Sequence, residues 1–341
     1  MMPFAESSKQ DMSCEYVGNT TTICRNAVSS DFRTSKHLFN RIYGTVRCID
    51  CNLTVLEANS FNNLGGYISV LDLTSSHIEI LEKEAFAGLT TLRELKLQNN
   101  TINNIENGSF ASLDSLWKLD LSNNKIEVLF GILNELPEIS SINLAHNKIS
   151  EIALIGNPGL QTLQSIDLSN NRIKVVKRKS FRNLPSLEII NLSNNPIATL
   201  QSRAFKGLSS LKTLNLSSCS ISDVQSGVLT TLFYLSNLDL SGNKITTFTT
   251  GSFSGLPELK TLDLSHNKIN TLKKTGVLSL PNLYSINLSH NNLRDLDYEL
   301  LVEIVPRLAS LDVSENPLSC STLDKIKEYF KNDNLLIITN S

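Results

Sequence analysis

Charged and aromatic residues are both scarce in this chain of 341 residues. Asp, Glu, Lys and Arg together make up 19% of it, and Phe, Trp and Tyr make up 6%. The 31 basic and 33 acidic side chains leave a formal net charge of only −2, which gives no electrostatic reason to expect nucleic acid as a partner. The hydrophobic fraction is an ordinary 40%, so the chain does not belong to the disordered class, in which low hydrophobicity accompanies high net charge.

Long apolar runs are also absent. The longest, such as 335–338, fall far short of the roughly 18 to 20 residues that a membrane-spanning helix needs, so we expect no membrane span in this chain. Residues 1–10 lack the charged start and the apolar core of a secretory signal. The protein is therefore either cytosolic or a mature or recombinant chain whose signal has been removed.

Motifs of common enzyme classes are missing too. The sequence contains no G-x-S-x-G, H-E-x-x-H, P-loop or dinucleotide-binding fingerprint. We therefore predict that the protein is not an enzyme and uses no cofactor.

What the sequence does contain is a repeat. The pattern L-x-x-L-x-L-x-x-N-x-L recurs eleven times in steps of 23 to 25 residues, after a degenerate copy that begins at Tyr43. The eleven copies begin at Ile68, Leu92, Leu116, Ile139, Leu163, Leu187, Leu211, Leu235, Leu259, Leu283 and Leu308. We expect positions 4 and 6 of each copy to point inward from a short strand, and positions 3, 5 and 7 to point outward. Position 9 is Asn in nine copies, and a buried amide there could satisfy backbone groups where the chain turns after the strand.

Repeat position 19 holds a phenylalanine in five copies, so that one ring per copy would stack on the side away from the strands. These residues are Phe86, Phe110, Phe181, Phe205 and Phe253. A single copy cannot bury its own apolar face, so neighbouring copies must stack into a solenoid. The pattern resembles the leucine-rich repeat family over about 85% of the chain, in the 24-residue class common in extracellular proteins. The resemblance implies an α/β leucine-rich repeat solenoid, a curved horseshoe with a parallel β-sheet on its concave face.

The repeats divide the chain into three parts. We predict an amino-terminal cysteine cap with the degenerate first repeat at 1–67, eleven repeats at 68–318, and a short carboxyl-terminal cap at 319–341. The cysteines gather near the two ends, at Cys14, Cys24, Cys48, Cys51, Cys219 and Cys320. This distribution suggests disulfide-closed caps and therefore an oxidising compartment.

Four of these cysteines belong to the amino-terminal cap. Cys14 and Cys24 flank a short turn and are expected to close a disulfide-bonded hairpin, which resembles the amino-terminal cap of Toll-like receptor ectodomains. Cys48 and Cys51 fall at inward-facing positions 6 and 9 of the degenerate copy. They could bridge each other, pair with the hairpin or remain buried thiols. Zinc or redox chemistry is less favoured, because no second pair and no nearby His accompanies them.

The carboxyl-terminal cap begins within 316–323, which resembles the opening of the cap of extracellular leucine-rich repeat proteins. We predict that Ser321 caps a short helix there, with Asp324 three residues on. The further cysteines usual in such caps are missing, so Cys320 belongs either to a truncated chain or to a variant without an internal partner. An unpaired Cys320 could link a second chain, as happens in mosquito leucine-rich immune proteins, which this segment also resembles.

A single Trp marks the candidate ligand surface. Trp117 falls at repeat position 2, at the edge of a strand, where most other copies have Ser, Gln, Glu, Lys or Arg. Its neighbours in the predicted sheet surround it with charge, namely Arg93, Glu94, Lys96 and Lys118. Because aromatic and Arg side chains are enriched at binding hot spots, we predict that a ligand binds here, on the amino-terminal half of the concave face. The alternative is that Trp117 only packs over the strand edge.

Three other clusters have structural explanations beside their functional ones. His266 and His290 occupy position 8 of adjacent copies and could suggest a metal site with Asp263, but the repeated S-H-N tripeptide favours solvated loops, and we predict no metal. Asp at position 5 could recognise a basic ligand, although it is also the ordinary consensus of the family.

A basic cluster follows the fifth predicted strand and comprises Arg172, Lys174, Lys177, Arg178, Lys179 and Arg182. These cations could contact sulfated glycans or another anionic surface, or they could form a solvated convex face.

Seven N-x-S/T sequons support secretion. Three of them arise from the repeat itself, at Asn191, Asn215 and Asn287. The predicted glycosylation sites are the other four, at Asn19, Asn52, Asn99 and Asn107. We therefore expect a non-catalytic extracellular recognition module: an innate-immunity or cell-adhesion receptor ectodomain, or a secreted recognition protein, that binds a protein ligand or co-receptor and could form a homo- or heterodimer. The alternative is an intracellular scaffold or enzyme inhibitor, which would have reduced cysteines and no glycans.

Overall fold

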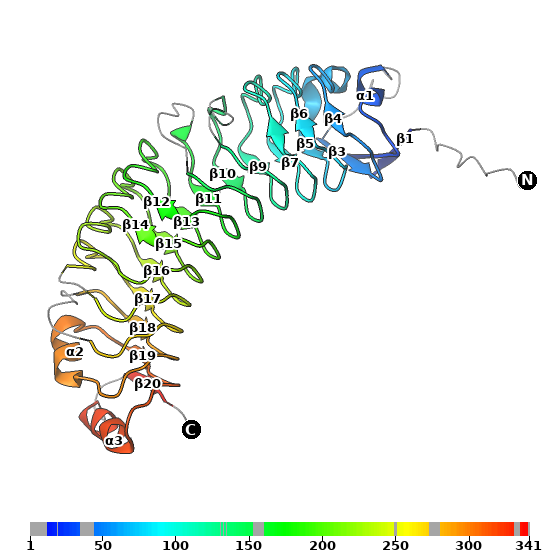
Figure 1. The fold of residues 1–341 in the computed structure, drawn as a ribbon. Helices are drawn as coiled ribbons and strands as arrows, with labels where there is room; N and C mark the ends of the chain where they lie inside the picture. Colours follow the sequence, from blue (N-terminus) through cyan, green and yellow to red (C-terminus); the bar gives the residue numbers. More distant parts are fainter. Residues whose placement is uncertain are drawn as a thin grey trace, which may run out of the picture. The chain divides into compact units, whose positions relative to one another are not determined.

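A computed structural model describes residues 12–18, 20–34, 44–129, 131, 133, 135–152, 160–248, 251–272, 280–330 and 335–339. The chain forms two compact units, which we describe separately. The first unit comprises Met1–Glu127 and Gly131–Asn143, and the second comprises Val128–Phe130 and Leu144–Ser341. In both units each repeat copy forms one coil, with a short strand on one side and a longer segment of turns on the other (Figure 1).

The strands of the first unit form a sheet in the order β1-β2-β3-β5-β7-β9-β10. β1 and β2 are antiparallel, and all later neighbours are parallel. The bounds are β1 Ser13–Val17, β2 Thr21–Arg25, β3 Gly44–Ile49, β5 Ile68–Asp72, β7 Glu94–Lys96, β9 Lys118–Asp120 and β10 Ser141–Asn143. Away from this sheet lie α1 Asp31–Thr34, the 3-10 helix η2 Asn62–Tyr67, and a small parallel sheet of β4 Val55–Leu56, β6 Ile80–Leu81 and β8 Asn104–Ile105.

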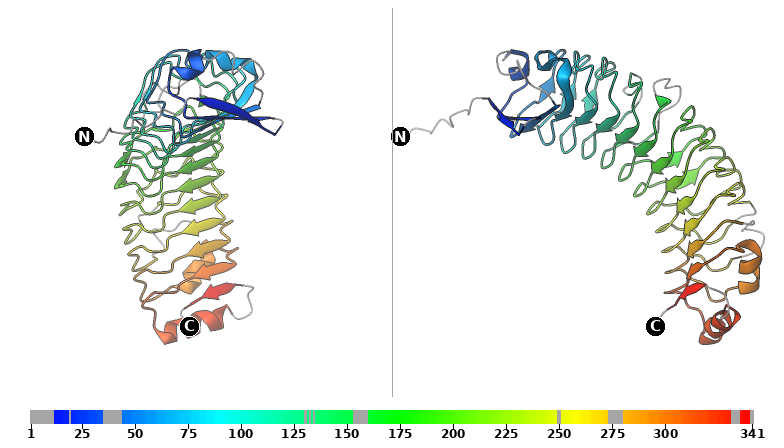
Figure 2. Two further views of the ribbon diagram at one scale, coloured as in Figure 1. Left: turned by 90° about the vertical axis from the view of Figure 1, so that its right-hand side faces the viewer. Right: turned by 180° about the vertical axis from the view of Figure 1, so that it is seen from behind.

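The second unit has the same construction, and its parallel strands lie side by side in both views of Figure 2. They are β11 Ser165–Asp167, β13 Ile189–Asn191, β15 Thr213–Asn215, β16 Asn237–Asp239, β17 Thr261–Asp263, β18 Ser285–Asn287, β19 Ser310–Asp312 and β20 Leu336–Ile338. The remaining elements are the strand pair β12 Val175–Val176 and β14 Thr199–Leu200, with the helices α2 Tyr298–Ile304 and α3 Cys320–Tyr329.

The strand register repeats the register of the sequence. Leu214 of β15 lies opposite Leu238 of β16, which lies opposite Leu262 of β17, all at repeat position 4. Each residue therefore stacks on the same repeat position of the next copy. A constant sequence period is thereby converted into columns of like residues, and the leucine columns form the core.

Four of the five predicted phenylalanines stack in two pairs, whereas Phe253 contacts Phe248 instead. The Phe86 and Phe110 rings stack with centroids 5.9 Å apart, and Phe181 and Phe205 are also 5.9 Å apart. Phe61 extends the column one coil further, at 5.7 Å from Phe86. These rings are almost completely buried, so each coil shields the apolar face of the next.

The position-9 asparagines form a buried hydrogen-bonded ladder. The side-chain Nδ2 of Asn171 donates to the carbonyls of Leu144, Leu168 and Ser169 at 2.9–3.1 Å. Its Oδ1 accepts from the backbone N–H of Ile149 at 2.9 Å. One amide therefore satisfies backbone groups of its own coil and of the preceding one, as the sequence predicts.

The prediction that position-7 side chains point outward is wrong in several coils. Its serines are buried in several coils, among them Ser122, Ser169, Ser193, Ser265 and Ser289. A local hydrogen bond accompanies this burial: Ser265 donates to Oδ1 of Asp263 from both its backbone N–H and its hydroxyl, at 2.8 and 2.7 Å. The carboxylate draws the hydroxyl against the strand end and away from water.

The carboxyl-terminal cap also differs from its prediction. Helix α3 begins at Cys320, and its N-cap is Ser319, whose hydroxyl accepts from the backbone N–H of Thr322 at 3.0 Å; Ser321 is not the cap. Ile326 and Phe330 are buried beneath the last coil. The chain then adds β20 to the sheet beside β19, a strand that the repeat pattern did not predict.

Candidate functional site

The amino-terminal cap holds two disulfides. Cys14 and Cys24 lie opposite each other in the β1–β2 hairpin, with Cα atoms 4.1 Å apart, and are bonded. Cys48 and Cys51 are bonded to each other, with Cα atoms 5.9 Å apart. Of the alternatives for the second pair, the structure has the local bridge, although Cys48 of β3 also lies opposite Cys24 of β2. Cys219 and Cys320 are free thiols, the first buried and the second exposed.

Trp117 lies at the entrance to β9 and is 51% exposed. Its backbone N–H donates to the carbonyl of Arg93 at 3.0 Å, and its own carbonyl accepts from Ser140 and Ser141 at 2.8 and 3.0 Å. The backbone is therefore fixed to the coils on both sides while the indole projects into solvent. Arg93, one coil earlier at the same repeat position, is also exposed.

The charged neighbours of Trp117 form a small ion-pair network. Glu94 of β7 and Lys118 of β9 are register partners, and Lys118 Nζ lies 2.9 Å from Glu94 Oε1. Lys96 Nζ lies 3.9 Å from the same oxygen. The structure thus brings together the predicted group of five residues, and Glu94 is shared between two lysines. Arg93 forms no salt bridge with a described residue and remains a free cation.

Sequence reasoning missed a group of exposed aromatic residues in the second unit. Phe233, Tyr234 and Tyr284 are 56%, 63% and 59% exposed. Tyr284 occupies repeat position 2, as Trp117 does, and its N–H donates to the carbonyl of Lys260 at 2.8 Å. A signal was available: the Phe-Tyr pair stands just before a copy, where all other copies except the one after Tyr67 have two residues that are not aromatic.

The two histidines form a stacked pair. The rings of His266 and His290 lie 4.1 Å apart between centroids, with planes inclined by 12°. Both residues have positive φ on the loops after their strands. Within the described parts of the chain, no group of three or more His, Cys, Asp or Glu side chains is placed to hold a metal ion.

The acidic ladder at position 5 has a structural role. Asp120, Asp239 and Asp312 each accept from the backbone N–H and the hydroxyl of the serine two residues on. Asn191 and Asn287 accept from the same backbone N–H without a charge. Because asparagine serves equally well, this hydrogen bond explains the position without a ligand.

The sequons differ in how their asparagines are held. Asn52, Asn99 and Asn107 have exposed side chains, and Asn19 lies outside the described residues. By contrast, Nδ2 of Asn191 donates to Asp167 Oδ2 at 3.0 Å, and Nδ2 of Asn287 donates to Asp263 Oδ2 at 3.2 Å. The side chain that would carry a glycan is exposed at the first three sites, whereas its amide nitrogen is engaged within the sheet at the last two.

The family model that matches the chain is Leucine rich repeat, at residues 66–126, 161–221, 211–269, 233–293 and 257–318. These matches cover 66–126 and 161–318, more than half of the chain, and they coincide with the coils described above. The protein therefore belongs to the leucine-rich repeat family.

Solved structures of similar fold come from bacteria and from an insect. An internalin of Listeria monocytogenes is 20% identical over 94% of this chain and 86% of its own, with a TM-score of 0.66. A leucine-rich repeat protein of Leptospira interrogans is 22% identical over 93% of this chain and 89% of its own, with a TM-score of 0.63. The Toll–Spatzle complex of Drosophila contains a chain that is 20% identical over 94% of this one, with a TM-score of 0.69; the match spans 48% of that chain, about half its length. At these identities the likeness concerns the fold.

A comparison with curated proteins finds no match to this sequence. Among the described residues, none of the helices combines the length and the apolar character needed to cross a membrane.

Proposed function

We propose that this chain is a non-catalytic, extracellular protein-recognition module, of the kind found in innate-immune or cell-adhesion receptors or in secreted recognition proteins, and that it binds a protein ligand through the sheet side of its first unit. The observation that carries this proposal is the exposed indole of Trp117 beside the Glu94–Lys118 ion pair. The similar fold of a chain in the Toll–Spatzle complex supports a protein as the partner class.

The first unit is favoured because its strands present large side chains. Trp117, Lys96, Lys118 and Glu94 lie on or beside β7 and β9. In the second unit, positions 3, 5 and 7 of the repeat copies that contain β11 to β19 have only Ser, Thr, Asn and Asp apart from Ile189. Binding hot spots need an anchor that buries much area, which short polar residues cannot provide. The charges around Trp117 would then orient a partner of complementary pattern.

The two disulfides support an extracellular location, since such bonds persist in oxidising compartments. The test is an intact-mass measurement of the protein from its native source, before and after glycan removal and after reduction. We expect two disulfides and glycans on one or more of Asn19, Asn52, Asn99 and Asn107. Fully reduced cysteines and no glycan would contradict this location and favour the alternative, an intracellular scaffold or enzyme inhibitor.

The ligand surface is tested by Trp117→Ala and Lys96→Glu. Tyr284→Ala is the matched control, because Tyr284 is similarly exposed at the same repeat position in the second unit. After melting curves confirm folding, partner capture from native extracellular fluid is compared by quantitative mass spectrometry. We expect the same captured proteins to be lost from both first-unit variants and retained by the control. Undiminished capture by Trp117→Ala, or loss only in Tyr284→Ala, would show that the ligand binds elsewhere.

A further inference from the structure

The segment 172–222 of the second unit is strongly basic in a chain that is otherwise balanced. It contains nine Lys and Arg residues and a single acidic residue, Glu188. Glu188 lies on the sheet side, where it pairs with Lys212 at 2.8 Å, so it does not neutralise the cations of the opposite side. Lys177 is the only other cation of this segment that forms a salt bridge within the described residues, with Glu151 at 2.5 Å.

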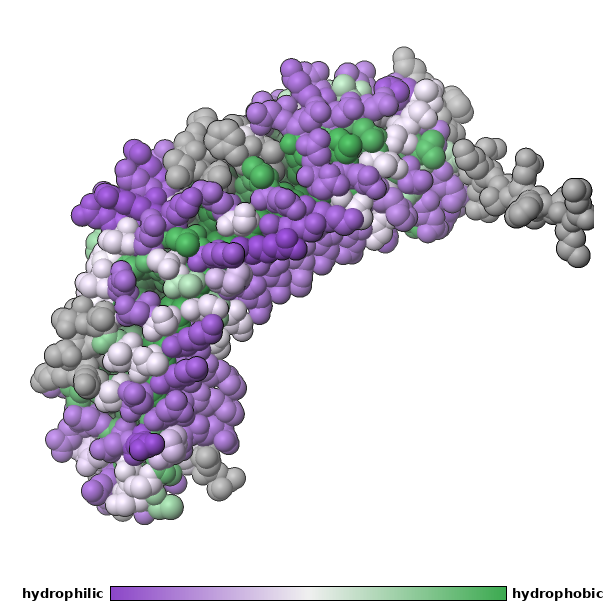
Figure 3. Space-filling view, viewed as in Figure 1, coloured by the Kyte–Doolittle hydropathy of each residue, from purple (hydrophilic) through white to green (hydrophobic). Residues whose placement is uncertain are grey.

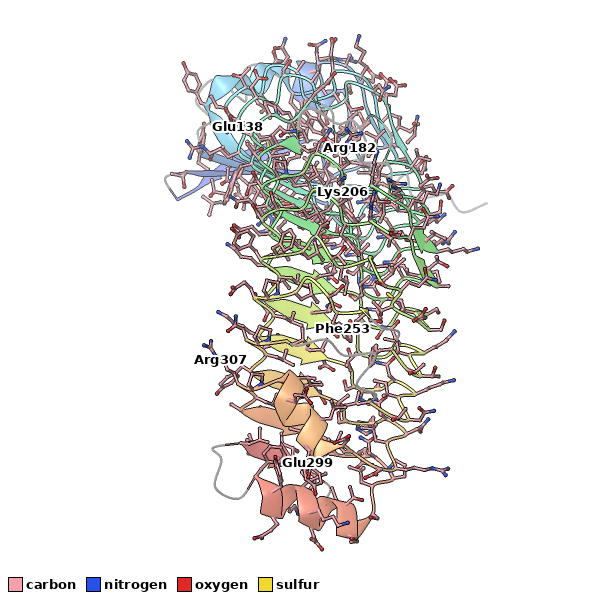
Figure 4. The ribbon with its side chains drawn as sticks, turned by 90° about the vertical axis from the view of Figure 1, so that its left-hand side faces the viewer. Glu138, Arg182, Lys206, Phe253, Glu299 and Arg307 are labelled. Carbon is pink, nitrogen blue, oxygen red and sulfur yellow. A yellow bond between two sulfur atoms is a disulfide. The ribbon has the colours of Figure 1, made fainter. Side chains whose placement is uncertain are left out.

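Four of the remaining cations form an array on two neighbouring coils. Lys179 and Arg203 occupy repeat position 17, and the backbone N–H of Lys179 donates to the carbonyl of Arg203 at 3.2 Å. Arg182 and Lys206 occupy position 20, and each donates a backbone N–H to the position-17 carbonyl of its own coil, at 3.0 and 3.2 Å. The strand register and these bonds place like charges beside like charges. Figure 4 shows Arg182 and Lys206 on adjacent coils.

A cavity of about 580 Å³ opens within this array. Lys179, Arg182 and Lys206 line it together with Gln161, Asn183 and Pro185, and no carboxylate of a described residue does. Arg182, Arg203 and Lys206 are exposed and Lys179 is half-buried. Hydrophilic residues cover much of the face of the molecule drawn in Figure 3. The unneutralised cations repel one another, and their mutual repulsion would be relieved by an anion held between them.

The repeat itself does not require these charges. Other copies fill positions 17 and 20 with neutral or acidic residues, namely Glu84 and Ala87, Gly108 and Ala111, Gly227 and Thr230, and Gly251 and Ser254. These copies form the same coils, so the fold offers no structural reason for four cations at corresponding places on two consecutive coils.

We propose that Lys179, Arg182, Arg203 and Lys206 form a binding site for a sulfated polysaccharide, with a sulfate group seated in the cavity and further sulfates along the array. Regularly spaced anions on one polymer match regularly spaced cations on successive coils. This site lies outside the ligand surface proposed around Trp117 and does not depend on it.

The chemistry of the surroundings favours a glycan over other polyanions. A single-stranded nucleic acid would need aromatic side chains for base stacking, and the cavity lining has none. Stable attachment to an anionic membrane takes an apolar anchor beside the basic patch. Among the described residues, the exposed large apolar side chains nearest in sequence are Ile189, on the strand side, and Phe233.

The test uses the full chain and immobilised heparin as the probe, in surface plasmon resonance at about 0.15 M salt. The double variant Arg182→Glu/Lys206→Glu should lose at least about tenfold in affinity, and its binding should depend less steeply on salt. The control Lys244→Glu/Lys268→Glu makes the same change in net charge at two exposed lysines one repeat apart, and should stay within about twofold of the unmodified protein. Arg182→Gln/Lys206→Gln, with melting curves, separates loss of the site from loss of the fold.

Three outcomes would overturn the proposal. The first is no binding to heparin, or equal losses in the array variant and the control variant. The second is equal binding to chemically desulfated heparin. The third is binding of single-stranded DNA or of phosphatidylserine vesicles through the same residues as tightly as heparin, which would show a general polyanion surface. Partner capture through Trp117 should be unaffected by either double variant, so failure here leaves the proposed function standing.

Discussion

The thiol of Cys219 lies 3.5 Å from the carbonyl oxygen of Leu192, at the place where nine other coils have the amide of an asparagine. A thiol is a weak donor and cannot offer the amide's strong acceptor oxygen. The consequence appears one coil earlier. The N–H of Ile173 donates to Asn195 Oδ1 at 3.0 Å, whereas the corresponding N–H of Ile197 donates to the carbonyl of Asn195 at 2.8 Å. The ladder of amides is interrupted here, and the Cys219 sulfur takes the place of the amide oxygen as a weaker acceptor for the backbone N–H groups of Asn195 and Ile197.

Cys219→Asn should therefore stabilise the protein. The new amide would restore hydrogen bonds that every neighbouring coil makes, and we expect a gain of about 1 kcal/mol in the free energy of unfolding. Equilibrium denaturation in urea at neutral pH measures it, with Cys219→Ala as the control that removes the thiol without supplying an amide. A variant less stable than the unmodified protein would show that this coil no longer accommodates the asparagine.

The same thiol predicts a dependence on alkaline pH. Burial raises the pKa of Cys219 from 9.0 to about 11. The folded state then keeps its proton where the unfolded state has lost it, so the thiol's contribution to stability is complete below pH 9 and is lost as pH rises to about 11. The loss is on the order of 2 kcal/mol. Urea denaturation at pH 7 and pH 10.5 should show the advantage of Cys219→Asn growing with pH; an advantage independent of pH would contradict the buried thiol.

Asn171→Leu should destabilise the second unit. Its amide satisfies three carbonyls and one N–H, and leucine would leave these buried groups without partners at a cost of about 1 to 3 kcal/mol. Asn237→Leu is the matched control, since it makes the same change at an exposed position 3 where another coil has Ile189. Thermal and urea unfolding compare the two. Equal stability of both variants would show that the asparagine ladder does not contribute to the free energy of unfolding.

The six cysteines should differ in their reactivity toward a thiol reagent. In the native protein a thiol reagent should modify Cys320 and no other cysteine, because Cys219 is buried and the four cysteines of the amino-terminal cap are bonded. Unfolding without a reductant should add Cys219. Peptide mapping by mass spectrometry identifies the sites, and non-reducing electrophoresis tests whether Cys320 links two chains. Modification of Cys14 or Cys24 without reductant would contradict the hairpin disulfide.

Much of the fold was predictable because the interactions of a solenoid are local. Each coil contacts only its neighbours, so a constant spacing from Leu92 to Leu116 to the later copies sets the register directly. The same argument places the position-9 asparagines in a ladder and Phe86 on Phe110. The group around Trp117 was predictable for this reason too, since register alone brings Glu94 opposite Lys118.

The tertiary structure decided what depends on geometry between unlike positions. Cys48 lies opposite Cys24 yet is bonded to Cys51, a choice that spacing left open. The cap of α3 is Ser319 because the helix begins two residues earlier than the capping pattern suggested.

The tertiary structure also decided which side chains are exposed to solvent. Several position-7 serines are buried and bonded to an aspartate or asparagine two residues before them, and Phe233 and Tyr234 are exposed although their sequence is apolar. The sequence by itself determined which residues share a column, because the period fixes that. The tertiary structure decided which columns are exposed to water and which cations lie together on two coils without a carboxylate between them. Both depend on the path of the chain between the strands, which only the folded coil sets.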